Sequence, residues 1–186
     1  MATAVNAHLM NAAMLARASE GIIAPVEVGL APKLLLYRFG GSVANARGGG
    51  WWLDEQQFTA VKTWAAVHGL ALPLAARVHC AVAHSWGATS PSGVNMTVLI
   101  RAEVLAPLRA YQGRSAPQSV VNAGRIDERL SPDELLGDPI NQLYIPGIDD
   151  PAINKAALLI GEPVIYDVGA SHIGGVPGIP KGALIQ

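Results

Sequence analysis

The stretch from Leu34 to Gly69, LLLYRFGGSVANARGGGWWLDEQQFTAVKTWAAVHG, has the most fully specified local structure in the chain. It begins with an apolar run, residues 34–39, that contains one cation, Arg38. A short apolar run bounded by turn residues predicts a buried strand. Five glycines then bracket the segment SVANAR, which predicts a flexible loop whose backbone can approach a ligand. Residues 51–53, which include two tryptophans, predict a second short strand.

A capped helix is predicted directly after the tryptophans. Asp54 and Gln57 have the three-residue spacing of a capping box. Apolar residues recur at helical spacing from Phe58 onward, and Gly69 suits the left-handed conformation that ends many helices. The sequence therefore predicts a helix over residues 55–68.

The length and composition of the chain limit the classes of protein to which it can belong. The chain has 186 residues, of which 51% are hydrophobic and 15% are charged, and this suits one domain with a sizeable core. Average proteins carry about 25% charged residues, so a surface this poor in charge indicates an interface with other proteins. The 13 basic residues do not cluster, and the net charge is −1, which argues against a nucleic-acid binder. A single cysteine, Cys80, excludes an intramolecular disulfide.

Two further features bear on location. The first basic residue is Arg17, whereas an export signal needs positive charge before its apolar segment. No uninterrupted apolar run reaches the ~20 residues that a membrane-spanning helix needs. We therefore expect no signal peptide and no membrane span, with a location in the cytoplasm or in a virion.

The remaining sequence predicts a mixture of helices and short strands. Residues 2–19 carry an apolar stripe that predicts a helix, and Pro25 and Pro32 predict an extended connector after it. Because neither a strand–helix–strand rhythm nor a phosphate-loop signature occurs, we expect an α+β fold. Further helices are expected at residues 72–83, from Ser131, and within 149–159; further strands at 96–104, 142–145 and 163–168; and irregular structure at 110–121.

The predicted organisation has three parts. Residues 1–33 are expected to form an N-terminal helix and an extended arm, and residues 34–170 an α+β domain. Residues 171–186 are expected to form an extended C-terminal tail, because five of the seven residues 174–180 are glycine or proline.

Three short motifs together resemble the ADP-ribosyltransferase fold. Leu36–Arg38 is similar to the strand that opens these domains with an arginine. Gly50–Trp52, followed by the predicted helix, is similar to their second strand and the helix after it. Gln142–Gly147 is similar to the motif that family members often write as the catalytic glutamate, three apolar residues and a proline. The resemblance covers about residues 34–148 and implies a small split antiparallel β-sheet with flanking helices.

The resemblance also implies roles for particular residues. In this family the arginine holds the phosphates or ribose of NAD, and a serine or threonine on the second strand supports the site. The glutamate stabilises the cationic ribose as nicotinamide leaves. Arg38 matches the arginine, and Trp51 and Trp52 beside it would be further cofactor contacts. Gln142 stands where the catalytic glutamate would be.

Two positions depart from the family pattern. Gln142 is neutral and cannot offset positive charge in the transition state. Residues 51–53 stand where the supporting hydroxyl would be. Another carboxylate, such as Glu103, Glu128 or Glu134, is an alternative source of the missing charge, and the spacing does not decide between them.

Each candidate also has a structural interpretation. The alternative for Arg38 is an ion pair with an acid such as Glu55 or Asp127. The alternative for the tryptophans is that one lies in the core and the other fills an interface. We favour this structural interpretation over cofactor binding. No metal site is predicted, because the spacing of His79, Cys80 and His84 fits no zinc pattern and suits core residues. Asp167, Ser171 and His172 are too close in sequence to indicate a catalytic triad.

Two functional hypotheses remain. The first is a non-catalytic structural or assembly subunit without a cofactor, for example a bacteriophage virion head or tail component. It would keep an ADP-ribosyltransferase-like scaffold and bind protein partners or further copies of itself. The second is an active NAD-dependent mono-ADP-ribosyltransferase that modifies a protein. The neutral side chain at position 142 favours the first hypothesis.

Overall fold

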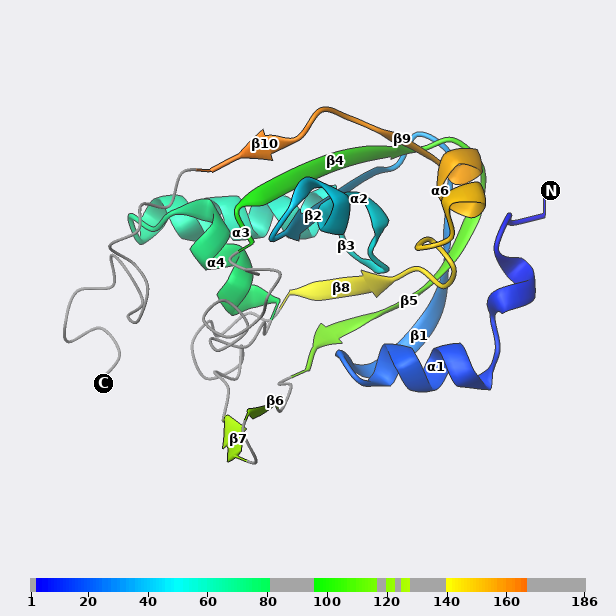
Figure 1. Cartoon of the computed structure of the whole chain (residues 1–186), viewed down its shortest axis with the longest axis horizontal. Helices are drawn as coiled ribbons and strands as arrows, with labels where there is room; N and C mark the ends of the chain where they lie inside the picture. Colours follow the sequence, from blue (N-terminus) through cyan, green and yellow to red (C-terminus); the bar gives the residue numbers. More distant parts are fainter. Residues whose placement is uncertain (1–2, 81–95, 117–119, 123–124, 128–139, 167–186) are drawn as a thin grey trace.

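The structure, a computed structural model, describes residues 3–80, 96–116, 120–122, 125–127 and 140–166. Within these residues helices pack against an antiparallel sheet (Figure 1). The predicted α+β class and the antiparallel sheet are therefore confirmed.

Eight strands form the main sheet, and every pair in it is antiparallel. Their order is β1-β5-β8-β3-β2-β4-β10, and β9 also pairs with β4. A separate two-stranded sheet consists of β6 (Val120–Asn122) and β7 (Arg125–Asp127). The strands of the main sheet are β1 (Ile22–Leu30), β2 (Leu35–Gly40), β3 (Trp51–Asp54), β4 (Val98–Val104), β5 (Leu108–Ser115), β8 (Asn141–Tyr144), β9 (Leu158–Ile160) and β10 (Val164–Ile165).

Strand β3 changes its partner along its length. Residues 51–52 pair with residues 143–144 of β8, whereas residues 53–54 pair with residues 36–37 of β2. Strands β2 and β8 therefore both flank β3, but each is held by a different half of it. The sheet divides at this point into one part with β1, β5 and β8 and another with β2, β4, β9 and β10 (Figure 1).

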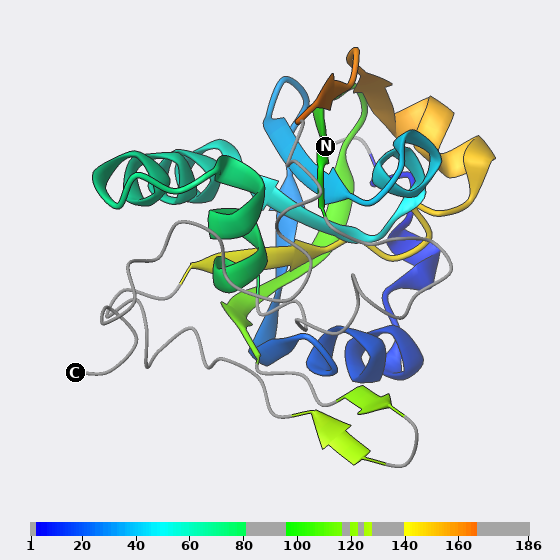
Figure 2. The same cartoon turned by 60° about the vertical axis from the view of Figure 1, so that its left-hand side comes forward.

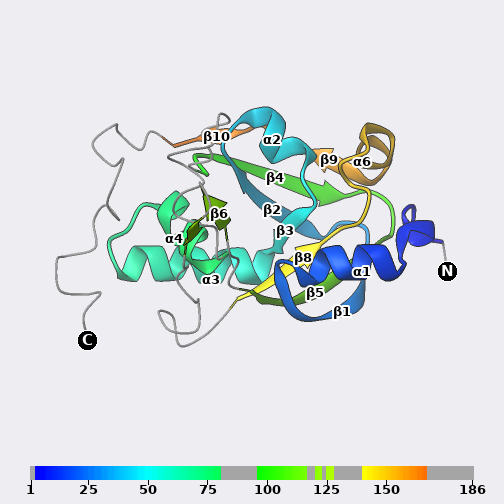
Figure 3. The same cartoon turned by 60° about the horizontal axis from the view of Figure 1, so that its bottom comes forward.

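Helices cover both sides of the β2–β4 part of the sheet. Figure 2 shows α3 and α4 on one side and α2 and α6 on the other. Figure 3 shows α1 lying across β5 and β8, where Tyr111 Oη donates to the Asn11 carbonyl at 3.3 Å. The helices are the 3₁₀ helix η1 (Ala7–Leu9), α1 (Ala12–Ser19), α2 (Val43–Gly48), α3 (Glu55–Val67), α4 (Leu72–His79) and α6 (Pro151–Ala157).

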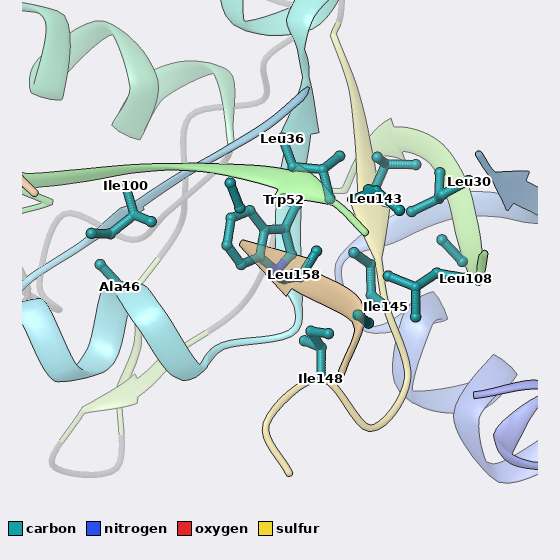
Figure 4. Close-up of a cluster of buried hydrophobic side chains, with 14 of the residues drawn as sticks. Leu30, Leu36, Ala46, Trp52, Ile100, Leu108, Leu143, Ile145, Ile148 and Leu158 are labelled. Carbon is teal, nitrogen blue, oxygen red and sulfur yellow. The ribbon is translucent and has the colours of Figure 1, made fainter. Parts of the chain in front are cut away.

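The two sides of the sheet bury two apolar clusters. One centres on Trp52 with Leu36, Leu143 and Leu158, and Figure 4 shows these side chains together. The other joins residues of α3 and α4 to the opposite side of β2 and β3. Each large apolar side chain that is fully buried stabilises the fold by roughly 1.5–3 kcal/mol, so these clusters hold β3 in place from both sides.

Helix α3 confirms the local prediction almost to the residue. It begins after Asp54, whose side chain accepts a 2.8 Å hydrogen bond from the Gln57 amide. It ends at Val67, and Gly69 has the left-handed φ of 62° that the sequence predicted. Capping and apolar spacing are local properties of the sequence, and they were sufficient to predict where this helix begins and ends.

The N-terminal prediction of one helix over residues 2–19 is wrong. The segment forms η1 and then α1, because Asn11 caps a new helix by accepting from Met14 N, whereas the side chain of Asn6 bonds to distant residues. Asn6 is fully buried, accepts from Arg109 N at 2.8 Å and donates to the carbonyls of Arg109 and Pro146 at 2.9 and 3.0 Å. It ties the N-terminal segment to β5 and to the end of β8.

Three more segments differ from the prediction. The expected extended connector over residues 22–32 contains β1, which pairs with β5 on both sides of a bulge between Ile23 and Val26. The expected loop SVANAR contains helix α2, capped by Ser42, whose Oγ accepts from Asn45 N at 3.1 Å. Residues 108–115 form β5, not irregular structure, because their neighbours β1 and β8 supply hydrogen bonds that no local pattern shows.

The other predicted elements occur with shifted ends. Strands β4, β8 and β10 lie within or next to the ranges expected for them, as do helices α4 and α6. The helix expected from Ser131 and the extended tail expected over residues 171–186 lie outside the described residues.

Candidate functional site

The candidate site lies where β2 and β3 separate. Arg38, Trp51, Cys80, Ser115 and Gln142 are linked there by the contacts described below, and we call these five residues the split site. They come from β2, β3, the end of α4, β5 and β8. The site therefore depends on the change of partner along β3, which holds β2 and β8 on its two sides.

Arg38 bridges the opening between β2 and β3. Its Nη1 donates to the Trp51 carbonyl at 2.7 Å, and its Nη2 and Nε contact the Asn45 carbonyl at 3.3 and 3.4 Å. Among the side chains that the structure describes, no carboxylate pairs with this guanidinium, so the expected ion pair with Glu55 does not form. The side chain of Asp127, the other expected partner, lies outside the described side chains.

The surroundings of Arg38 leave it charged. Burial lowers the pKa of Arg38 to about 10, and the electrostatic interaction with Cys80 partly opposes this shift. At pH 7 the guanidinium is still a cation, held by neutral carbonyl oxygens. Such a group stabilises the loop between β2 and β3, because hydrogen bonds from a charged donor are stronger than neutral ones.

Gly49 makes room for this guanidinium. A Cβ atom added at Gly49 would lie 1.7 Å from Arg38 Nη2 and 2.0 Å from its Cζ. The glycine-rich loop was predicted to let backbone approach a ligand, and in the structure the group that approaches it is the side chain of Arg38. The sequence carried a signal here, since a glycine run beside a lone arginine is visible, but it did not identify the partner.

The two tryptophans lie in different surroundings. Trp52 is buried in the core, and its Nε1 donates to the Gly49 carbonyl at 2.8 Å. Trp51 is half-buried, with its ring 4.9 Å from the ring of Tyr144 at an interplanar angle of 44°. Of the two, only Trp51 presents part of its surface to solvent.

Gln142 points into the protein. It is 5% exposed, and its Nε2 donates to Ser115 Oγ and, at 3.2 Å, to the Cys80 carbonyl. Both amide hydrogens are thus used inside the protein. A buried amide with its donors satisfied is stable where it is, whereas turning it toward a ligand would break two hydrogen bonds.

Cys80 connects the two sequence-predicted positions. Its carbonyl accepts from Gln142, and its sulfur interacts electrostatically with Arg38. Burial raises the pKa of the Cys80 thiol to about 12, although the charge of Arg38 opposes the shift. The group is a neutral thiol at pH 7, and a thiol with a raised pKa is a poor nucleophile.

The chemistry available at the split site is limited. Its members among the described residues are a cation, a neutral amide, a hydroxyl, a neutral thiol and an aromatic ring. No three His, Cys, Asp or Glu side chains within the described part of the chain come together as a metal site would require. These groups can donate hydrogen bonds and stack, but none of them supplies negative charge to a cationic transition state.

Sequence reasoning missed Ser115 and Tyr144. Ser115 lies in a segment that looked irregular, and Tyr144 looked like an ordinary strand residue. Their roles follow from strand pairing, since Ser115 lies two residues beyond Gly113, which pairs with Gln142, and Tyr144 pairs directly with Trp51. No local pattern contains this information.

No protein-family model, curated protein sequence or solved structure matches this chain. None of the helices in the described residues has the length and apolar character needed to cross a membrane.

Proposed function

We propose that this protein is a non-catalytic assembly subunit built on an ADP-ribosyltransferase-like scaffold. It would bind further copies of itself or other proteins, as a component of a bacteriophage virion head or tail does. It would need no cofactor for this role.

The main support for the proposal is that the side chain of Gln142 is neutral, buried and hydrogen-bonded inside the protein. The resemblance aligns this residue with a glutamate whose negative charge stabilises a cationic ribose. Here the side chain is neutral and buried, and its amide is held by Ser115 and Cys80. Catalysis of the family type would need both a different charge and a different side-chain direction at this position.

The hydrogen bonds of Arg38 support the same conclusion. Arginine suits NAD binding because its planar donors can grip phosphate oxygens in pairs. In this protein three of its nitrogens contact the carbonyls of Trp51 and Asn45. Binding a dinucleotide phosphate in the family manner would compete with these bonds.

Exposed apolar side chains support an assembly role. Single exposed hydrophobics are normal, but Leu159, Val164 and Ile165 all come from the β9–β10 edge of the sheet. Strand edges with unpaired backbone groups are the places where sheets pair with other chains. Together with the low charge content, this edge favours a protein that works in contact with other copies.

Two measurements test the proposal. Incubation with NAD should release no nicotinamide above the rate without protein, and Arg38→Ala should change nothing. The solution mass, measured by light scattering over a range of concentrations, should rise above the 19.4 kDa of one chain. A monodisperse monomer at all concentrations, with no protein partner, would contradict the assembly role.

An active NAD-dependent mono-ADP-ribosyltransferase is the second candidate. The observation that favours it is the link between the two family positions, because Cys80 bonds to Gln142 through its carbonyl and interacts electrostatically with Arg38. This candidate predicts nicotinamide release that is lost in Arg38→Ala. Release that is equal in the two proteins would exclude it.

A further inference from the structure

Among the residues that the structure describes, one buried histidine outside the split site has no hydrogen-bond partner. His79 is the last residue of α4 and is 3% exposed, and within this part of the chain neither Nδ1 nor Nε2 of its ring is hydrogen-bonded. Buried polar groups are almost always paired, so an unpaired imidazole calls for a physical explanation.

The contacts of His79 join α4 to α3. Its ring meets the indole of Trp64 edge-on, with centroids 5.1 Å apart and an interplanar angle of 88°. The same indole stacks on the ring of His68 at 4.3 Å, and His68 Nδ1 lies 2.8 Å from the Trp64 carbonyl. Trp64 thus contacts one buried and one exposed imidazole, and the buried one belongs to the neighbouring helix.

The groups around His79 disfavour its charged form. Burial, and to a smaller extent the charge of His68, the residue that follows α3, lowers the pKa of His79 to about 4. On its own helix the nearest cation is Arg77, and the next residue, Cys80, is a neutral thiol. Within the described residues no acid contributes to the pKa of His79 and favours protonation.

The direction of the pH effect follows from this. An unfolded or released histidine has a pKa of 6.5, against about 4 in the closed structure. The released form therefore binds more protons between these two values, and the closed form loses stability as the pH falls through that window. Above pH 6.5 the ring is neutral in both forms, and its contact with Trp64 fully stabilises the packing of α4 on α3.

We propose that His79 is an acid-operated latch, which holds α4 against α3 at neutral pH and releases α4 when the ring is protonated. Release would uncover apolar surface of α3, since Val61 and Ala65 of α3 are buried in the same apolar cluster as Ala75 and Ala76 of α4. It would also separate the Cys80 carbonyl from Gln142. The latch does not depend on the assembly proposal, since it rests only on the α3–α4 contact.

Hydrogen exchange of the full-length protein tests the latch. The two pKa values imply that the opening equilibrium of α4 rises roughly 30-fold between pH 7.5 and pH 5. After correction for the intrinsic rates, the protection of α4 amides should fall by about this factor, while amides of β3 and β8 keep theirs. His79→Phe, which keeps a ring against Trp64, should abolish the change. His8→Gln, which removes an exposed histidine, should leave it intact.

Two results would overturn the latch. One is an equal loss of α4 protection in the wild-type protein and in His79→Phe. The other is an equal loss of protection in α4 and in the sheet, which would mean that the whole protein opens. A direct NMR titration of the His79 ring needs no variant: a pKa below about 5.5 supports the latch, and a higher pKa overturns it.

Discussion

Arg38 and Gly49 depend on each other. The guanidinium can reach the Trp51 carbonyl only because position 49 has no side chain, and a Cβ atom there would overlap Nη2. Gly48, the preceding residue, has open space around its missing Cβ. The two adjacent glycines therefore form a matched pair for a substitution experiment.

Gly49→Ala should destabilise the protein by roughly 1–3 kcal/mol, because the displaced guanidinium loses its charged hydrogen bonds. Gly48→Ala should change the free energy of unfolding by less than about 1 kcal/mol. Urea unfolding measures both. If Arg38 is the group displaced, Gly49→Ala should cost much less in the background of Arg38→Ala. Equal costs in the two backgrounds would show that Gly49 acts through some other contact.

Gln142 shows how far a single residue can be interpreted from the sequence. Its neutrality was visible at once, and so was its departure from the family glutamate. Its burial and its bonds to Ser115 and Cys80 were not, because they join residues 27 and 62 positions away in the chain. The chemical type of a site residue is local information, whereas its direction and partners are not.

Helix α3 is determined by its own sequence. Its cap, its apolar spacing and its terminal glycine all lie within residues 54–69. Strand β3, four residues long, was also predicted from its own sequence, but its pairing with β8 was not, since β8 comes from a distant part of the chain. Elements with local signals were predicted well, whereas β1 and β5, which exist through pairing, were not.

Removing the cap of α3 should have a measurable cost. Asp54→Ala deletes the side chain that accepts from Gln57 N and should destabilise the protein by about 0.5–2 kcal/mol. Asp54→Asn keeps an acceptor and should cost less than half as much. Thermal unfolding followed by circular dichroism gives the comparison, with the exposed Thr59→Ala as a control. An equal loss of stability in Asp54→Ala and Asp54→Asn would mean that the charge of the carboxylate, not the capping hydrogen bond, stabilises the helix.

The two edges of the sheet differ in how they meet solvent. Strand β1 is interrupted by a bulge between Ile23 and Val26 and contains Pro25, and both features hinder pairing with another strand. Both edges expose apolar side chains, Ile23 and Val26 on β1 and Leu159, Val164 and Ile165 on the opposite edge, but β9 and β10 contain no proline. If copies of this chain associate, this second edge is the better surface for contact.

Charges on that edge should reduce association. The double variant Val164→Lys and Ile165→Lys should lower the mass measured by light scattering toward 19.4 kDa, because burying two ammonium groups is costly. Val67→Lys is the matched control, since Val67 is 75% exposed but belongs to α3. An unchanged mass in the double variant would place the contact elsewhere or exclude self-association.

By itself, the sequence determined the α+β class, the capped helix after Asp54, and the lack of charge at position 142. It also predicted strands β2, β3, β4, β8 and β10 and helices α4 and α6. These follow from side-chain chemistry and from periodicity over a few residues. Only the tertiary structure decided that β1 and β5 belong to the sheet, that Arg38 binds carbonyls next to Gly49, and that Gln142 faces inward. The physical reason is that strand pairing and burial join residues far apart in the chain, and their energies depend on neighbours that a local pattern does not contain.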